Sequence, residues 1–207
     1  MPIDASPRLR ADAARNAERI LRAAREVYAE CGPDAPLEEI ARRAGVGIRT
    51  LFRRFPSKAE LVRALIDQSI AEHITPAIER ALADDNPLLG LATAMEAALS
   101  MAAREHSTLA AAMHAGSLTA EVSAPFYDSL AELTRRAQQA GLIRADLVPD
   151  DLPRIMAMLV GVLWTMDPNS DGWRRYLALV FDALTGTGSL PPAVPPRHAP
   201  QSGNWPL

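Results

Sequence analysis

Three arginines lie close together in one short stretch of the chain. Arg49, Arg53 and Arg54 fall between Ile48 and Phe55, after a Gly-Val-Gly turn and before the helix-stopping Pro56. A guanidinium group pairs with phosphate, and it can also bond two acceptors of guanine in the major groove of DNA. A short helical pattern precedes the turn. Two short helices around a glycine turn, with the second one basic, indicate a helix-turn-helix.

Each side chain of this second helix has a distinct expected role. Arg49 is the first choice for reading a base, and Ile48 could contact a thymine methyl group. The remaining polar residues suit phosphates, and Phe52 either packs on a sugar or belongs to the core. A solvated basic helix face is the alternative for the arginines. The candidate DNA-binding residues are Gly47, Ile48, Arg49, Thr50, Phe52, Arg53, Arg54 and Lys58.

Lys58 enters this set through a helix start. The Ser57-Lys58-Ala59-Glu60 segment is a capping box, in which the serine hydroxyl and the glutamate satisfy free backbone amides. It places Lys58 at the positive end of the next helix, where a phosphate can bind.

The charge of the chain is divided unevenly along its length. Residues 1–66 contain 13 Lys or Arg against 9 Asp or Glu, whereas residues 67–207 contain 9 against 16. An acidic surface repels DNA, so contact with nucleic acid is expected only in the N-terminal third.

Composition and patterning predict an all-α protein of about nine helices. Hydrophobic residues make up 48% of the chain and aromatics 5%, and no long β-branched, alternating runs occur. No apolar run is long enough to span a membrane and no signal peptide is evident. The single Cys31 suits a cytoplasmic protein and is expected to be buried on the first helix.

Breaks in the pattern predict four segments. Residues 1–13 are expected to be a flexible basic arm, which either reaches DNA or is a solvated tail. Residues 14–66 form the helix-turn-helix domain, and residues 67–186 form a helical body for ligand binding and dimerisation. Residues 187–207 are rich in proline and are expected to be a disordered tail.

The body contains two further sets of candidates. Methionine adapts to irregular apolar pockets, although it is also a common filler of protein cores. The candidate pocket residues are Met95, Leu99, Met113, Phe126, Leu130, Met158 and Trp164. A nearly all-apolar helix around residues 155–164 and its successor offer a dimer surface, unless the first is simply the central helix of the body. The candidate interface residues are Ile155, Leu159, Val162, Trp173, Tyr176, Val180 and Phe181.

The N-terminal third resembles the tetracycline-repressor (TetR) family of transcriptional regulators over about residues 15–66. The matching residues are Ile40-Ala41-x-x-Ala44-Gly45-Val46, Thr50-Leu51-Phe52-x-x-Phe55-Pro56-Ser57-Lys58 and Leu61. The resemblance implies an all-helical dimer that binds DNA. A small molecule bound in the C-terminal body would alter the spacing of the two DNA-binding domains. The family often has serine at 47, a polar residue and glycine at 48 and 49, tyrosine at 52 and histidine or tyrosine at 54. Because these positions differ in this chain, its operator sequence cannot be inferred from the operators of relatives.

The expected function is that of a sequence-specific regulator. The partners would be double-stranded DNA with a near-palindromic operator, a second copy of the chain, and a small, partly apolar ligand. Repression is inferred from the family alone. An enzyme is not expected, because the sequence has no phosphate loop, nucleophile elbow or metal-spaced His/Cys set. No cofactor, metal or membrane is expected. The alternative is a helical protein-interaction module that has lost specific DNA binding.

Overall fold

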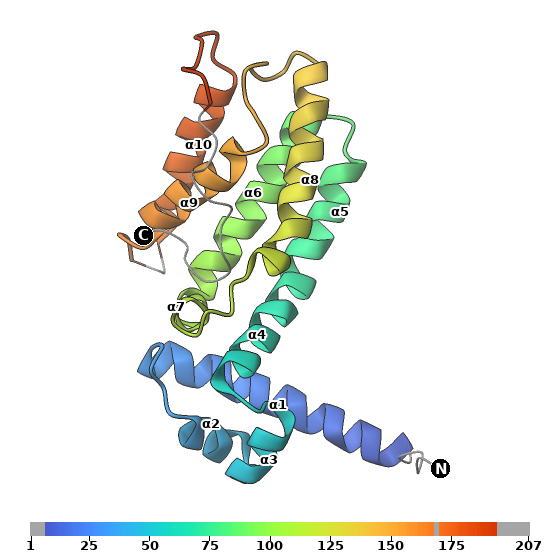
Figure 1. Cartoon of the computed structure of the whole chain (residues 1–207), viewed down its shortest axis with the longest axis vertical. Coiled ribbons are helices and arrows are strands. Elements are labelled where there is room, and N and C mark those ends of the chain that lie inside the picture. Colours follow the sequence, from blue (N-terminus) through green and yellow to red (C-terminus); the bar gives the residue numbers. More distant parts are fainter. Residues whose placement is uncertain (1–6, 168–169, 194–207) are drawn as a thin grey trace. The chain divides into compact units, whose positions relative to one another are not determined.

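The computed structural model describes residues 7–167 and 170–193, and all its regular elements are helices (Figure 1). No described helix is long and apolar enough to cross a membrane. The elements are α1 (Pro7–Cys31), α2 (Leu37–Ala44), α3 (Ile48–Arg54), α4 (Lys58–Ser69), the π-helical η1 (Ile70–Ile74), α5 (Thr75–Ala83), α6 (Pro87–Arg104), α7 (His106–His114), α8 (Ala120–Gln139), α9 (Asp151–Leu163) and α10 (Trp173–Leu184).

The all-α prediction is confirmed. The backbone remains helical at the two junctions where α4, η1 and α5 meet. Counted as one continuous helix, these three elements bring the total among the described residues to nine helices.

The described chain forms two compact units. The N-terminal unit runs to Asp67 and also includes Glu105–Leu118, and the C-terminal unit comprises Gln68–Arg104 and the chain from Thr119 onward. The expected division placed all of 67–186 in one body. The structure instead groups α7 with the helix-turn-helix, because α7 packs on α1. Arg25 forms an ion pair of 3.1 Å with Glu105, just before α7.

The core of the N-terminal unit follows the apolar spacing of its helices. On α1, Ile20, Ala24 and Val27 recur at steps of four and three, and each is fully buried. Ile40 of α2 and Leu51 of α3 are also fully buried. The same apolar faces that define the helices in the sequence therefore hold α1, α2 and α3 together.

Two expectations about α1 are wrong. The helix begins at Pro7, so the part of the expected arm from residue 7 onward is helical, while residues 1–6 lie outside the described residues. Cys31 is exposed. It is the last residue of α1, and the burial of the apolar face ends with Val27 and Tyr28.

Three helices of the C-terminal unit run side by side. Figure 1 shows α5, α6 and α8 packed lengthwise, with α9 and α10 packed together and against α6. Gly90 permits a close crossing of α5 and α6, because a Cβ there would lie 2.5 Å from the Ala81 carbonyl oxygen. Fully buried Leu91, Met95 and Leu133 fill the centre of this unit.

One proline lies inside α8 rather than at its first position. The helix begins at Ala120, and Pro125 lies inside it. Proline is tolerated near a helix start because the first four backbone N–H groups have no partner within the helix. Pro125 falls just beyond that first turn, so the helix lacks one backbone hydrogen bond there, the one to the Glu121 carbonyl.

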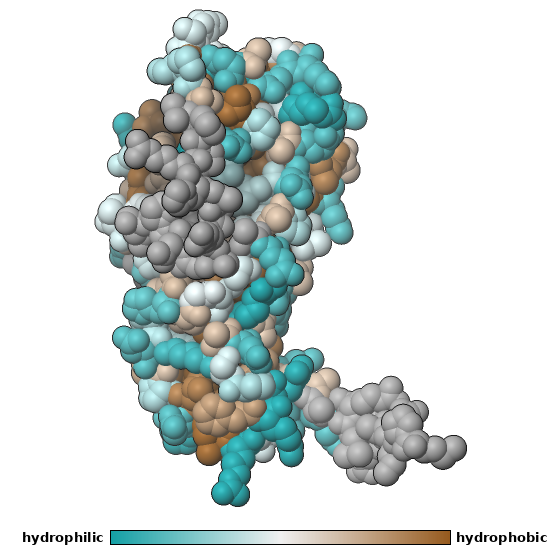
Figure 2. Space-filling view, viewed as in Figure 1, coloured by the Kyte–Doolittle hydropathy of each residue, from teal (hydrophilic) through white to brown (hydrophobic). Residues whose placement is uncertain are grey.

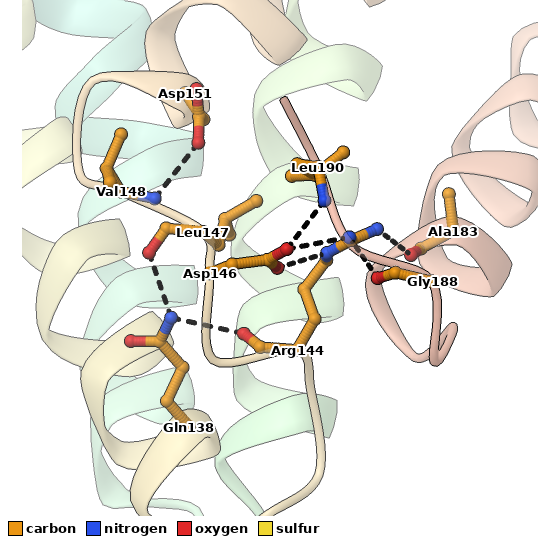
Figure 3. A network of polar contacts seen from close by, with 9 residues as sticks. All are labelled: Gln138, Arg144, Asp146, Leu147, Val148, Asp151, Ala183, Gly188 and Leu190. Atoms are coloured by element: carbon orange, nitrogen blue, oxygen red, sulfur yellow. Dashed lines mark hydrogen bonds and ion pairs between the residues drawn. The ribbon is translucent and has the colours of Figure 1, made fainter. Parts of the chain in front are cut away.

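A polar network joins the loop after α8 to the segment after α10 (Figure 3). Arg144 donates through Nε to Asp146 Oδ1 at 2.6 Å and through Nη2 to the Gly188 carbonyl at 2.5 Å. The Leu190 N–H donates to Asp146 Oδ2 at 2.7 Å. Residues 188 and 190 are therefore held in place, although they belong to the segment 187–207 that was expected to be disordered. Residues 194–207 lie outside the described residues.

The network predicts a pH-dependent contribution to stability. Hydrogen bonds from Arg144 and Leu190 hold the pKa of Asp146 well below its ordinary value of 3.8. Since the folded pKa lies below the unfolded one, the carboxylate stabilises the fold above pH 3.8 and loses this effect as the pH falls toward the folded value. Asp146→Asn should therefore lower the urea midpoint at pH 7, and its difference from the wild type should shrink steadily below about pH 4.

The matched control is Asp150→Asn, because Asp150 makes no capping hydrogen bond at the start of α9. An unchanged midpoint for Asp146→Asn at pH 7, or a gap that stays constant down to pH 2.5, would contradict the assignment.

Candidate nucleic-acid interface

The turn between α2 and α3 is fixed by backbone hydrogen bonds around one glycine. Gly45 has φ +62°, in the left-handed region that favours glycine. The Val46 N–H donates to the Ala41 carbonyl at 3.0 Å, and the Gly45 N–H donates to the Arg42 carbonyl at 3.1 Å. This pair of bonds is the Schellman arrangement, which closes a helix and turns the chain sharply away.

Arg19 of α1 makes a second connection to the same turn. Its Nη2 donates to the carbonyl oxygens of Ala44 at 2.5 Å and Gly45 at 3.1 Å. These carbonyls lie at the negative end of α2, where a cation is favourable. No local pattern in the sequence points to this partner, which lies 25 residues away.

The turn leads directly into α3. Gly47 precedes α3 with an extended backbone, and its carbonyl accepts the N–H groups of Thr50 at 2.8 Å and Leu51 at 3.1 Å. Leu51 and Phe55 are buried and anchor one face of α3.

The other face of α3 is open. Arg49, Arg53 and Arg54 are exposed, Ile48 and Thr50 are half-buried, and 43% of Phe52 is exposed. Figure 2 shows hydrophilic side chains projecting from the lower end of the visible face, where Figure 1 places α2 and α3. The exposure of Phe52 shows that it is not enclosed in the core.

Ion pairs outside α3 neutralise many cations of the N-terminal unit. Arg43 pairs with Glu30 at 2.5 Å, Arg42 with Glu39 at 2.6 Å, and Arg63 with Asp67 at 2.9 Å. The hydrogen bond from Arg43 holds the pKa of Glu30 below its ordinary value, and the bond from Arg42 does the same for Glu39. These carboxylates therefore stay charged and paired.

The cations of α3 are left without such partners. Within residues 7–167 and 170–193, Arg49 and Arg53 make no hydrogen bond or ion pair. The guanidinium carbon of Arg54 lies 5.2 Å from the centroid of the Phe55 ring, which leaves its charge uncompensated. Positive charge is thus concentrated on the exposed face of α3.

Lys58 lies at the start of α4. The Glu60 N–H donates to Ser57 Oγ at 3.1 Å, which is the serine half of the expected capping box. Lys58 Nζ lies 5.8 Å from the centroid of the Tyr28 ring. Burial raises the pKa of Tyr28 to about 12, so the ring beneath the ammonium group is neutral at physiological pH.

Two family models match this chain. The model described as bacterial regulatory proteins of the tetR family matches residues 20–65. The model described as the C-terminal domain of SbtR-like transcriptional regulators matches residues 48–186. The chain belongs to the TetR family. This membership covers the N-terminal DNA-binding domain and most of the C-terminal helices, so the resemblance first drawn from about a third of the chain is confirmed.

Solved structures of TetR regulators have the same fold. A regulator from Streptomyces coelicolor is 30% identical over 83% of this chain and 99% of its own, with a TM-score of 0.56. One from Mycobacterium vanbaalenii is 31% identical over 86% and 99%, with a TM-score of 0.57. AibR, in complex with isovaleryl coenzyme A and operator DNA, is 21% identical over 82% and 98%, with a TM-score of 0.60. No curated protein matched the sequence.

The candidate pocket residues are dispersed. Met95, Leu99 and Leu130 are buried in the C-terminal unit, and Phe126 is half-buried beside Tyr127, with ring centroids 5.3 Å apart. Met158 is 64% exposed, which is incompatible with a place in an enclosed pocket. The others are Met113 of α7, in the N-terminal unit, and half-buried Trp164 at the end of α9.

The candidate dimer residues divide between two faces. Leu159 and Trp173 are buried within the C-terminal unit, so they pack inside the protomer. Tyr176 is exposed, and the side chains of Ile155, Val162, Val180 and Phe181 are half-buried. Two further apolar side chains of these helices are exposed, Leu179 at 51% and Met158 at 64%. Each lies next to a named interface candidate.

The left-handed conformation of Gly45 predicts that a side chain at this position destabilises the protein. Gly45→Ala should lower the free energy of unfolding by about 1–2 kcal/mol, because a side chain in the left-handed region is strained. Its Cβ would also lie 2.8 Å from Arg19 Nη2. Urea denaturation followed by circular dichroism measures the loss.

Gly47→Ser is the matched control for this substitution. Position 47 has extended dihedrals and open space around a Cβ. Serine there should change stability by only a few tenths of a kcal/mol, in the stabilising direction. Equal stability of Gly45→Ala and the wild type would show that the turn does not depend on glycine.

Proposed function

We propose that this TetR-family protein is a sequence-specific repressor. Its helix-turn-helix would occupy a near-palindromic operator, and a small molecule bound in the C-terminal unit would release it. The observation that carries the proposal is the charge distribution of the N-terminal unit. Among the described residues, carboxylates neutralise the arginines of α2 and α4, whereas Arg49, Arg53 and Arg54 make no ion pair and project from the exposed face of α3.

The residues of α3 divide by chemistry into base-reading and phosphate-binding groups. Arg49 follows the first residue of the helix, and N-terminal residues of a recognition helix meet base edges in the major groove. Its fork would bond the two acceptors of guanine, and Ile48 beside it would contact a thymine methyl group. Arg53, Arg54 and Lys58 would bind phosphates, with Thr50 as a neutral donor.

Dimerisation would present two copies of the helix-turn-helix domain to one DNA site. The exposed apolar side chains of α9 and α10 are the surface proposed for the second copy, and they include Met158, Tyr176 and Leu179. A two-fold axis would make the operator a near-palindrome, with half-site centres about 34–36 Å apart or a multiple of that distance.

Ligand control is proposed from the family. AibR, which shares the fold, has been solved with both isovaleryl coenzyme A and operator DNA. A ligand that binds the free repressor more tightly than the DNA-bound one would shift the population away from DNA.

The first test measures binding of the chain to the intergenic DNA beside its own coding sequence. Six phosphate contacts, from Arg53, Arg54 and Lys58 in two helix-turn-helix domains, would give a slope of log affinity against log salt of about −5. Arg49→Ala should weaken binding and relax the preference at one base pair of each half-site, with a loss of about 1–3 kcal/mol in discrimination. Fluorescence anisotropy with a set of single-base operator variants measures both.

Arg135→Ala is the control, because Arg135 pairs with Glu132 on α8, outside the N-terminal unit. Uniform weakening across all DNA variants would reduce Arg49 to a phosphate contact. Absence of binding at low salt by the wild type would favour the alternative of a protein-interaction module.

The second test concerns the dimer. Leu179→Glu should convert the dimer to a monomer, because it places a charge within the proposed apolar interface. Light scattering after size-exclusion chromatography measures the mass. Leu89→Glu is the matched control, since Leu89 is 54% exposed on α6 rather than on α9 or α10. Loss of the dimer in both variants, or in neither, would contradict the assignment of this surface.

A further inference from the structure

The C-terminal unit contains a polar hollow that the proposed function does not use. It has a volume of about 360 Å³ and is lined by one face each of two neighbouring segments. Residues at positions 72, 73, 76, 77 and 80 come from η1 and α5, and residues at 93, 96, 97, 100 and 104 come from α6. Steps of three and four place each set on one side of its helix. None of the seven candidate pocket residues lines this hollow.

The two glutamates of this hollow have partners of their own. Glu96 forms an ion pair with Arg174 of α10, and Glu72 accepts a hydrogen bond of 2.6 Å from the Gln68 amide. Arg104 donates to the Ser100 hydroxyl at 2.6 Å, a neutral partner. Arg80 makes no hydrogen bond or ion pair to any of the described residues.

The two guanidinium groups therefore retain most of their donors. Each guanidinium carries five N–H donors in a planar fork that fits carboxylate or phosphate. Arg80 and Arg104 are exposed, which leaves these donors open to a molecule from solvent.

The wall of the hollow includes an unusual backbone segment. In η1 the Thr75 N–H bonds to the Ile70 carbonyl, five residues back, instead of four as in an α-helix. Single π turns of this kind occur frequently at functional sites. This one carries Glu72 and His73, and the half-buried His73 is one of the lining residues.

The remaining lining restricts the chemistry of an occupant. Pro76, Ala77 and Ala97 provide small apolar surfaces between the polar groups. The volume lies at the low end of the range for small-molecule sites, about 300–1,000 Å³. We propose that this hollow binds a small organic oxyanion, a carboxylate or a phosphate with a short apolar part, through Arg80 and Arg104.

Binding of an oxyanion in this hollow does not require DNA. Only the role of that anion in releasing the protein from DNA rests on the proposed function. Binding of the anion to the free protein is measured without DNA. A failure of DNA binding would thus leave this test intact, and a failure of anion binding would leave the proposed DNA contacts of α3 untouched.

The experiment follows the His73 ring by nuclear magnetic resonance. The His73 signal is assigned as the one that disappears in His73→Gln. Inorganic phosphate and butyrate are titrated separately at constant ionic strength and pH, with sodium chloride as the reference salt. We expect a saturable shift with at least one of the two anions, and the anion that saturates identifies phosphate or carboxylate as the preferred group.

Two variants make the result specific to this hollow. Arg80→Ala combined with Arg104→Ala should weaken the apparent affinity at least about tenfold, as expected when charge-assisted bonds are lost. Arg135→Ala, outside the hollow, should leave it unchanged. All three substituted arginines are exposed, so neither variant is expected to disturb the core. Circular dichroism verifies that each variant is folded. Equal affinities in the wild type and the double variant, or shifts no larger than those from chloride, would overturn the proposal.

Discussion

The left-handed turn at Gly45 is the constraint on which the DNA-facing surface depends. The turn directs α3 away from α2, so that Leu51 and Phe55 enter the core and the arginines between and beside them remain outside. Arg19 reinforces the turn by bonding the last carbonyls of α2 from α1. A short helix of this kind is unstable in isolation, and its orientation comes from these tertiary contacts.

The distribution of ion pairs in the N-terminal unit determines the net charge of the α3 surface. The N-terminal unit contains acidic residues, yet they pair with arginines of α2 and α4 rather than with those of α3. Within the described part of the chain no carboxylate pairs with the arginines of α3, and release of counterions from DNA would favour association at this helix. The acidic remainder of the chain keeps this attraction local to one end of the sequence.

Local features were predictable from the sequence, because their signals lie within a few residues. The glycine turn, the Ser57 cap and the exposed face of α3 all follow from spacing and residue type. Contacts between distant segments were not. Arg19 meets a turn 25 residues away, α7 packs on α1, and Arg144 binds Gly188, and none of these pairs leaves a local pattern.

An error of helical phase accounts for the misplacement of Met158 and Leu159. Met158 and Leu159 are adjacent, and the structure exposes the first and buries the second. On a helix that is apolar almost all round, composition does not distinguish the inward from the outward face. The hollow beside η1 was missed for another reason, since its polar lining comes from two segments whose facing sides meet only in the folded unit.

The central claim is that α3 reads DNA as one half of a symmetric pair. Selection of binding sequences from a random pool of duplex DNA, followed by sequencing, tests it most directly. The account predicts enrichment of a near-palindrome with half-site centres about 34–36 Å apart, or a multiple of that distance, and loss of one specified base in each half when Arg49 is replaced by Ala. Enrichment of a single unpaired site, or of no sequence at all, would contradict it.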